Sequence, residues 1–348
     1  MAREPRRRVV AVFVLFVALL MVAAGGAGSQ LGPNVDLSVA SGEFGASDAV
    51  LVQVTVSNPT KHTVHVLSWL TGAEGLDAPI FRVTRDGSPV AYTGPIVKRP
   101  RAAAGDYVAI KAGEQLSRVV DLGDAYDLTQ SGTYEIAYDV SSAELFEGKT
   151  SASAPDSLAS APVTVKVEGR AAKGKPPGGG GGTFTECSTT QQSQLTAARG
   201  NASTYAQNAS AYLNAGTAGP RYTTWFGDFA SQRYNQVSSN FVKISSAFAT
   251  ANITYDCSSK RNVYAFVYPN QPYKIYLGRV YWSAPATGTD SQAGTLIHEM
   301  SHFTVVAGTD DLAYGQTAAK ALATSDPASA IRNADSHEYF AENTPAQS

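Results

Sequence analysis

Alternation of apolar and polar residues dominates the first half of the chain. It recurs in five short stretches that are rich in valine and bounded by turn-forming residues, at positions 49–58, 62–69, 80–87, 132–140 and 161–169. A period of two is typical of strands with one buried face. Because these strands follow one another with no helical stretch between them, the pattern predicts an all-β, immunoglobulin-like sandwich over residues 30–168.

The second half has a different period. Residues 188–216 and 226–251 predict two long helices, a short pair of strands is expected at 262–269 and 274–282, and the rest is expected to be helical. Residues 185–348 are therefore predicted to form a mostly helical (α+β) domain with a small sheet.

Between the two halves, residues 169–184 form a segment of unusual composition. They include basic residues, two prolines and five consecutive glycines. Such a sequence is typical of a flexible, exposed linker, and exposed linkers are preferred sites of proteolysis. The chain is therefore expected to hold two domains joined by a segment that proteases can reach.

The first 29 residues have the order of a secretory signal. Four arginines precede an apolar run at 9–24, and small residues follow at 25–29. A run of sixteen apolar residues is shorter than the ~20 that cross a bilayer, which favours a cleaved signal peptide over a membrane anchor. We therefore expect a secreted protein. Since export permits disulfides, we expect a bridge between the only two cysteines, Cys187 and Cys257.

The overall charge of the chain excludes one class of function, nucleic-acid binding. The chain has 27 Lys and Arg against 29 Asp and Glu, for a formal net charge of −2. It therefore lacks the basic excess with which proteins bind nucleic acids. We expect no nucleic-acid partner, no membrane partner once the signal is removed, and a monomeric chain.

The densest group of chemically active residues lies at 295–315. His298 and His302 are four apart, so a helix through them places both imidazoles on one face, where they can bind one metal ion. Glu299, beside the first histidine, can accept a proton from metal-bound water, which is the zinc-peptidase interpretation of His-Glu-x-x-His. The alternative is an ordinary helix whose histidines lie on a polar surface.

Zinc in a peptidase needs a third protein ligand, and the residues leave its identity open. A histidine six residues past His302, the metzincin solution, is excluded because that position is Gly308. Glu338 or Glu342 on a later helix can serve. Asp311 can serve as well, because Gly308 permits a left-handed helix end after which the chain turns back toward the ion.

Three segments together resemble a known family. They are GTLIHEMSHF, GTDDLAYG and NADSHEYFAENTPAQS, and they are similar to the aspzincin metallopeptidases, which comprise deuterolysins and peptidyl-Lys metalloendopeptidases. The second group is the closer match, and the resemblance covers most of residues 185–348. It implies a zincin-like catalytic domain, and it implies that the strand-rich half is a propeptide.

The resemblance also implies a site. His298, His302 and Asp311 would hold one Zn²⁺ per chain. Glu299 would be the general base. Tyr314, expected on the same helix face as Asp311, would donate a hydrogen bond to the developing oxyanion. The family motif Gly-Thr-x-Asp-x-x-Tyr-Gly is met in full, whereas a second disulfide that the resemblance to the peptidyl-Lys group implies is missing.

Asp335 and Glu338 bear on the choice of substrate. They are three apart and share a helix face, and from the residues alone an N-cap and a solvated acid are the simpler interpretation. In peptidyl-Lys enzymes, acids at the matching positions line the pocket for the lysine that follows the cut bond. The resemblance therefore implies cleavage of proteins and peptides on the amino side of lysine. His337, between the two acids, receives no role.

The linker contains lysines that such an enzyme would cut. Lys173 and Lys175 are flanked by small residues, and the bond Ala172–Lys173 is preferred because cleavage before Lys175 would place a proline next in the site. We expect self-removal of a prosegment, with a linker lysine held in the acidic pocket beforehand. The alternatives are a permanent two-domain enzyme and an exported β-sandwich binding module with an inactive metallopeptidase-like domain.

Overall fold

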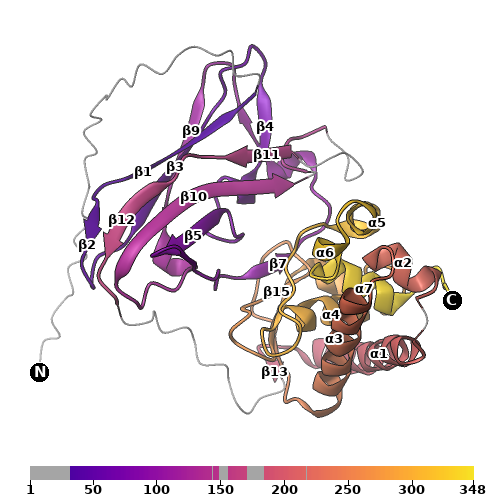
Figure 1. The fold of residues 1–348 in the computed structure, drawn as a ribbon. Coiled ribbons are helices and arrows are strands. Elements are labelled where there is room, and N and C mark those ends of the chain that lie inside the picture. Colours follow the sequence, from indigo (N-terminus) through magenta and orange to yellow (C-terminus); the bar gives the residue numbers. More distant parts are fainter. Residues whose placement is uncertain (1–31, 143, 149–155, 171–183, 217) are drawn as a thin grey trace, which may run out of the picture. The chain divides into compact units, whose positions relative to one another are not determined.

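The computed structural model describes residues 32–142, 144–148, 156–170, 184–216 and 218–348. The expected signal segment and the expected processing residues Ala172, Lys173 and Lys175 lie outside the described residues. Within them the chain forms a strand-rich N-terminal region and a helical C-terminal region with a small sheet, as Figure 1 shows. The β-rich half and the mostly helical half that the sequence predicts are both present.

Two sheets and a strand pair build the N-terminal region. The three-stranded sheet has the order β1 (Asn34–Val39), β3 (Leu51–Ser57), β9 (Gln115–Asp121). The larger sheet has the order β2 (Glu43–Phe44), β12 (Val163–Val167), β10 (Gly132–Ser142), β5 (Phe81–Arg85), β6 (Ser88–Pro89), and β11 (Asp156–Ala159) also pairs with β10. The separate pair is β4 (Val64–Leu67) with β8 (Tyr107–Ile110).

The alternation in the sequence places one face of these strands in a core. In β3, Val52, Val54 and Val56 are buried, while the residues between them are partly exposed. They share one cluster of buried side chains with Tyr134 and Ile136 of β10. The three-stranded sheet and the larger sheet therefore have a common core, and each such buried side chain stabilises the fold by roughly 1.5–3 kcal/mol.

The C-terminal region contains the two long helices that the sequence predicts, α1 (Thr189–Asn214) and α3 (Ser231–Thr250). A capping box of Ser188 and Gln191 starts α1. The buried face of α1 consists largely of alanine, which lets α3 and α4 pack closely against it; its residues are Leu195, Ala198, Ala202, Ala206, Ala209 and Leu213. The other helices are α2 (Pro220–Phe226), α4 (Gln292–His302), α5 (Gly315–Ser325), α6 (Pro327–Ala330) and α7 (Ala334–Glu342).

A five-stranded sheet accompanies these helices, in the order β13 (Phe184–Thr185), β14 (Thr254–Asp256), β16 (Lys274–Leu277), β15 (Ala265–Val267), β7 (Ile96–Lys98). The pair of β15 and β16 is the strand pair expected from the sequence. Strand β7 comes from the N-terminal half and pairs antiparallel with β15. The sequence pattern predicts no strand there, because three residues are too few to show alternation.

Cys187 and Cys257 form a disulfide, with their Cα atoms 5.0 Å apart. It joins the residue before the cap of α1 to the residue after β14, and their separation along the chain is 70 residues.

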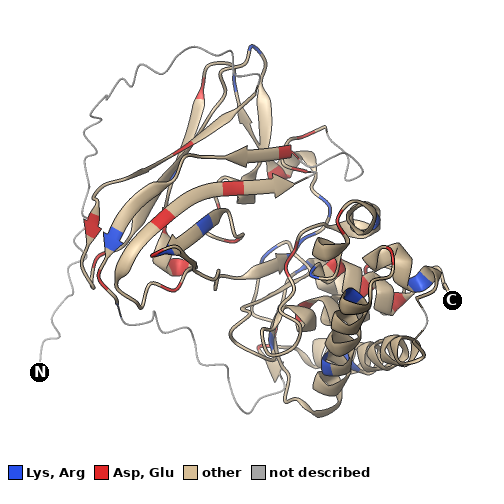
Figure 2. Cartoon of the chain, in the orientation of Figure 1, with Lys and Arg blue, Asp and Glu red and all other residues tan. Residues whose placement is uncertain are grey.

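None of the described helices is long and apolar enough to cross a membrane. Acidic and basic residues are intermixed over the strands β2, β12 and β10 (Figure 2). Nζ of Lys166 on β12, for example, lies 3.2 Å from Oε1 of Glu43 on β2.

Candidate metal centre

Helix α4 carries both histidines and is buried along its whole length. Its cap is Ser291, whose hydroxyl accepts a hydrogen bond from the backbone N–H of Gly294. The carboxyl group of Glu342, on α7, accepts hydrogen bonds from the backbone N–H and the hydroxyl of Ser291, at 2.9 and 2.7 Å. Burial raises the pKa of Glu342 to about 8. Among the described residues, Glu342 therefore contacts the start of α4 and not its histidines.

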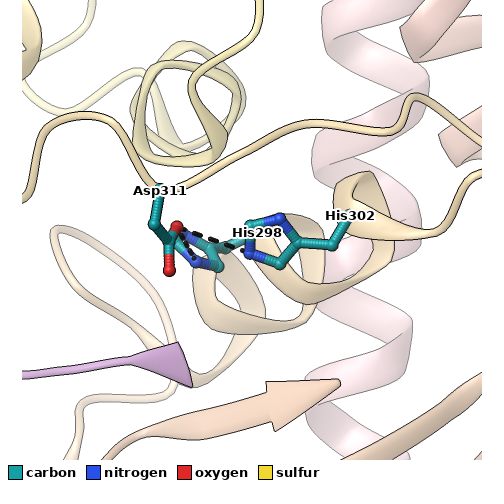
Figure 3. Close-up of side chains that lie close together, drawn as sticks. All are labelled: His298, His302 and Asp311. Atoms are coloured by element: carbon teal, nitrogen blue, oxygen red, sulfur yellow. Dashed lines mark ion pairs between the residues drawn. The ribbon is translucent and has the colours of Figure 1, made fainter. Parts of the chain in front are cut away.

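Three side chains converge on one point beside α4. The Nε2 atoms of His298 and His302 lie 3.0 and 3.4 Å from Oδ1 of Asp311, as the dashed lines in Figure 3 mark. Both imidazoles are fully buried, and the Asp311 side chain is 7% exposed. Within the described chain, none of these three atoms has a hydrogen-bond partner. Buried polar atoms are rarely left so, and two imidazole nitrogens with one carboxylate oxygen at this spacing fit a zinc ion.

The other ring nitrogen of each histidine faces an oxygen atom. Nδ1 of His302 lies 2.9 Å from the carbonyl oxygen of Thr309, and Nδ1 of His298 lies 2.8 Å from Oδ1 of Asp335. An Nδ1–H that donates to an oxygen leaves Nε2 available as the metal ligand. Thr309 therefore selects the tautomer of His302 that leaves Nε2 for a metal, whereas the Asp335 carboxylate lies within ion-pair distance of Nδ1 of His298.

Helix α4 ends earlier than the sequence analysis expects. Its last residue is His302, and Phe303 is its C-cap in an extended conformation. Gly308 has the predicted left-handed conformation, with φ of +59°, but it lies in the turn that follows and not at the helix end. The chain reverses within this turn before it reaches Asp311.

The segment with Asp311 and Tyr314 is not helical, so the expectation that they share a helix face is wrong. The side-chain oxygen of Asn333 accepts hydrogen bonds from the N–H groups of Leu312 and Ala313, both at 3.0 Å, and this holds the segment open. Sequence reasoning missed Asn333, because its amide acts on backbone groups far away along the chain.

Tyr314 nevertheless reaches the centre from this extended segment. Its hydroxyl donates a hydrogen bond to Oδ2 of Asp311 at 3.1 Å. Burial raises the pKa of Tyr314 well above its usual value, so the phenol keeps its proton and remains a donor.

Glu299 follows His298 on α4 and is fully buried. Neither carboxyl oxygen of Glu299 has a hydrogen-bond partner among the described residues. Burial raises the pKa of Glu299 to about 7, against the opposing effect of His298 and His302. A carboxyl group with a pKa near neutrality is suited to accept and return a proton at pH 7.

Lys98, the last residue of β7, lies against Asp335 and Glu338 of α7. Its Nζ is 3.3 Å from Oδ1 of Asp335 and 2.5 Å from Oε2 of Glu338, and no side chain of the three is more than 3% exposed. Burial lowers the pKa of Lys98, but the two carboxylates outweigh burial and hold the pKa well above its usual value. The two acids are thus buried and paired with a cation, and the N-cap of α7 is Asn333.

Lys98 is absent from the sequence-based candidates, which place a lysine of the linker in the acidic pocket. The structure gives this position to a lysine of the N-terminal half instead. The sequence holds only a weak indication of a short strand here: the apolar pair Ile96 and Val97 precedes Lys98, and Pro100 ends the stretch. Nothing local connects that stretch with α7, because Lys98 and Glu338 are 240 residues apart.

His337 lies on α7 between the two acids and has structural contacts. Its Nε2 is 3.0 Å from the side-chain nitrogen of Asn240, and its Nδ1 is 2.9 Å from the carbonyl oxygen of Asn333. The ring packs against Phe226 and Phe241. Burial lowers the pKa of His337 to about 4, so the ring is neutral at pH 7, with Nδ1–H donating to Asn333 and Nε2 accepting from Asn240.

Comparison with known proteins identifies the family of this site. The aspzincin family model, described as lysine-specific metallo-endopeptidase, matches residues 211–342. An extracellular protease from Aeromonas hydrophila is 43% identical over 87% of this chain and 90% of that protein. A peptidyl-Lys metalloendopeptidase from Grifola frondosa is 37% identical over 91% of this chain and 94% of that protein.

Among solved structures, a zinc peptidase from Grifola frondosa is 50% identical, over 47% of this chain and 100% of that one, with a TM-score of 0.45. The Aeromonas protease and the Grifola metalloendopeptidase are matched along most of their length, so the similarity includes the strand-rich half as well as the metal centre. The chain therefore belongs to the aspzincin family of zinc metallopeptidases.

Proposed function

We propose that the chain is a secreted endopeptidase that cuts proteins and peptides on the amino side of lysine, with Asp335 and Glu338 as the lysine pocket. The observation that carries this proposal is the position of Lys98, whose amine contacts both acids. Its ammonium group stands in for the lysine side chain of a substrate. Relatives named peptidyl-Lys metalloendopeptidase support the same substrate class.

One zinc ion per chain, held by His298, His302 and Asp311, is the proposed cofactor. A zinc ion with three protein ligands supplies a Lewis acid that acidifies a water molecule and polarises a carbonyl group. Asp311 is favoured as the third ligand because it faces the Nε2 atoms of both histidines. Glu338 faces Nδ1 of His298, at 3.3 Å, on another edge of the ring.

The chain's own residues handle the proton and the charge. Glu299 accepts the proton of the attacking water and returns it to the amine that leaves. Tyr314 donates its O–H to the oxygen of the scissile carbonyl, and a donor of this kind contributes ~3 kcal/mol to catalysis. Asp335 has two contacts, because it lies against the ammonium group of Lys98 and against Nδ1 of His298.

The N-terminal region is proposed to be an immunoglobulin-like prosegment over residues 30–168, which follows a signal peptide. Residues 169–184 would be the linker that the enzyme cuts to remove the prosegment, with Ala172–Lys173 as the preferred bond. The separate clusters of buried side chains in the N-terminal and C-terminal regions support this division. The released catalytic domain, residues 185–348, is proposed to act as a monomer.

A map of cleavage sites tests the proposal. The enzyme, freed of its prosegment, digests a mixture of proteins, and mass spectrometry identifies the first residue of each product. We expect lysine at that position, loss of cleavage with a chelator and recovery with zinc. Products without a preference for lysine would refute the pocket, and indifference to the chelator would favour the binding module with an inactive domain.

A further inference from the structure

Strand β7 lies on the edge of the five-stranded sheet as an extended peptide would. It pairs antiparallel with β15, with Lys98 opposite Ala265 and Val97 opposite Phe266. Addition of a strand to a sheet edge is a common mode of peptide binding, in which backbone hydrogen bonds set the direction and alternate side chains enter pockets. Here the chain supplies the added strand from its own N-terminal half.

The two residues around the Val97–Lys98 bond take up the positions of a bond to be cut. The Lys98 side chain enters the acidic pair. One residue earlier, the carbonyl oxygen of Val97 lies 3.4 Å from the hydroxyl oxygen of Tyr314, within hydrogen-bond distance. The same hydroxyl lies 3.1 Å from Oδ2 of Asp311, so the carbonyl of the residue before the lysine is placed next to the metal-binding residues.

Contacts on both sides of this bond keep it in place. The Val97 side chain packs in a small apolar cluster with Val263 and Phe266. On the other side, the guanidinium of Arg99 lies 4.6 Å from the centre of the Trp69 ring. The strand is therefore held across the site by the catalytic region and by the N-terminal region together.

The bond is out of reach of other molecules. Val97 is 1% exposed and Lys98 is 2% exposed. A protease acting from outside needs several residues of accessible, extended chain, which this segment does not offer. The active site of the same chain is the one that already holds the bond.

We propose that Val97–Lys98 is an internal cleavage site, hydrolysed by the active site of the same molecule; this rests on the proposed function. Water adds its oxygen to the carbonyl carbon of Val97, and the bond from that carbon to the nitrogen of Lys98 breaks. Val97 keeps a carboxylate and Lys98 becomes a new N-terminal ammonium, so atoms and charge balance. The cut divides β7, and it weakens the attachment of the N-terminal half to the lysine pocket.

The experiment begins with the precursor, residues 30–348, purified in the presence of a chelator. Zinc is added, samples are denatured at intervals, and mass spectrometry identifies the N-termini. We expect a chain that begins at Lys98, formed at the same first-order rate when the protein is diluted a hundredfold. The Glu299→Ala precursor should not form it.

A second measurement reads the binding of the strand without catalysis. An amine-reactive ester is added to the metal-free precursor, and the modification of each lysine is followed. Lys98 should react at least about tenfold more slowly than Lys111 and Lys166, whose side chains are 75% and 72% exposed. Equal reactivity would show that the strand does not occupy the site and would overturn the inference.

The inference and the proposed function fail in different ways. If enzyme freed of its prosegment cuts lysine peptides but the precursor never yields a chain beginning at Lys98, the inference is wrong and the function stands. If that chain appears at a rate that rises with protein concentration, cleavage between molecules replaces cleavage within one. If the freed enzyme cuts no lysine peptide, the proposed function is wrong and the inference falls with it.

Discussion

Asp311 and Glu338 present carboxylates to different edges of one imidazole. Oδ1 of Asp311 lies 3.0 Å from Nε2 of His298, whereas Oε2 of Glu338 lies 3.3 Å from Nδ1 of the same ring. His302 also directs its Nε2 toward Asp311. The roles proposed for the two acids, one toward the metal and one toward the ammonium group of a lysine, can therefore be tested separately.

We predict that Asp311→Ala loses zinc and that Glu338→Gln keeps it. Elemental analysis of the purified variants measures zinc per chain. In enzyme freed of its prosegment, Glu338→Gln should lower kcat/KM for a lysine peptide roughly ten- to hundredfold, because a hydrogen bond to a charged group is worth about 1.5–3 kcal/mol. Loss of zinc in Glu338→Gln but not in Asp311→Ala would make Glu338 the metal ligand and remove Asp311 from that role.

His337 should make the stability of the fold depend on pH. The pKa of its buried ring, about 4, lies below the value of about 6.5 in an unfolded chain. Below pH 6.5 the His337 ring takes up a proton in the unfolded chain, whereas the ring stays neutral in the folded chain until the pH approaches 4. The contribution of the neutral ring to stability is therefore complete above pH 6.5 and is lost as the pH falls toward 4, by about 2 kcal/mol at pH 5.

Urea unfolding of the metal-free precursor at pH 7.5 and pH 5 measures this effect. The difference between the two unfolding free energies should be about 2 kcal/mol larger in the parent than in His337→Gln, whatever the variant costs at neutral pH. Other titrating groups are common to both proteins and cancel. The same pH dependence in parent and variant would mean that His337 is protonated in the folded state.

At the scale of elements, α4 and α7 pack closely through a glycine. A Cβ atom at Gly294 would overlap Oε1 of Glu342 and lie 3.0 Å from Oε1 of Glu338. Glycine inside a helix costs ~1 kcal/mol relative to alanine. Its presence in α4 is explained by the two acids, because Glu342 approaches the helix to contact its cap and Glu338 approaches it while it contacts Lys98.

We therefore predict that Gly294→Ala destabilises the protein by about 1–3 kcal/mol, the range typical of overpacked cores. The matched control is Gly200→Ala in α1, where an added Cβ meets nothing within 4 Å and should stabilise by about 0.5–1 kcal/mol. Urea unfolding of both variants, free of metal, compares them. A change of the same sign in both would refute the packing argument.

Periodicity predicts some of these elements and is silent on others. The helical period places His298 and His302 on one face of α4, and the alternation of valines predicts β3, because each pattern is local. Strand β7 and the extended segment with Tyr314 are different. Strand β7 forms by pairing with β15, and the segment with Tyr314 is held by the side chain of Asn333. The conformation of neither segment is therefore determined by its local sequence.

At the scale of the whole molecule, the N-terminal half supplies Lys98, whose amine contacts the two acids of the proposed lysine pocket. Lys98 is covalently part of the chain, so it competes with substrates at an effective concentration that is typically in the millimolar range for linked ligands. If the two acids bind the lysine of a substrate, as proposed, that substrate must displace Lys98 first. The precursor is therefore expected to bind lysine peptides poorly, without any change in the catalytic residues themselves.

The last prediction follows from this competition. In a Glu299→Ala precursor loaded with zinc, so that nothing is cut, Lys98→Met should tighten the binding of a fluorescent lysine peptide by about tenfold or more. A methionine cannot neutralise Asp335 and Glu338, and a buried, unpaired pair of acids is unfavourable, so β7 should leave the pocket. Fluorescence anisotropy gives the dissociation constants.

Lys111→Met in the same precursor is the control, since Lys111 is an exposed lysine of the N-terminal half that pairs with Glu114. It removes the same charge without touching the pocket, so it should bind the peptide as the parent does. Equal tightening in both variants would trace the effect to net charge and not to occupancy of the pocket. Unchanged binding in Lys98→Met, with zinc still present, would mean that a substrate reaches the acids while β7 is in place, and the N-terminal half would then need another role.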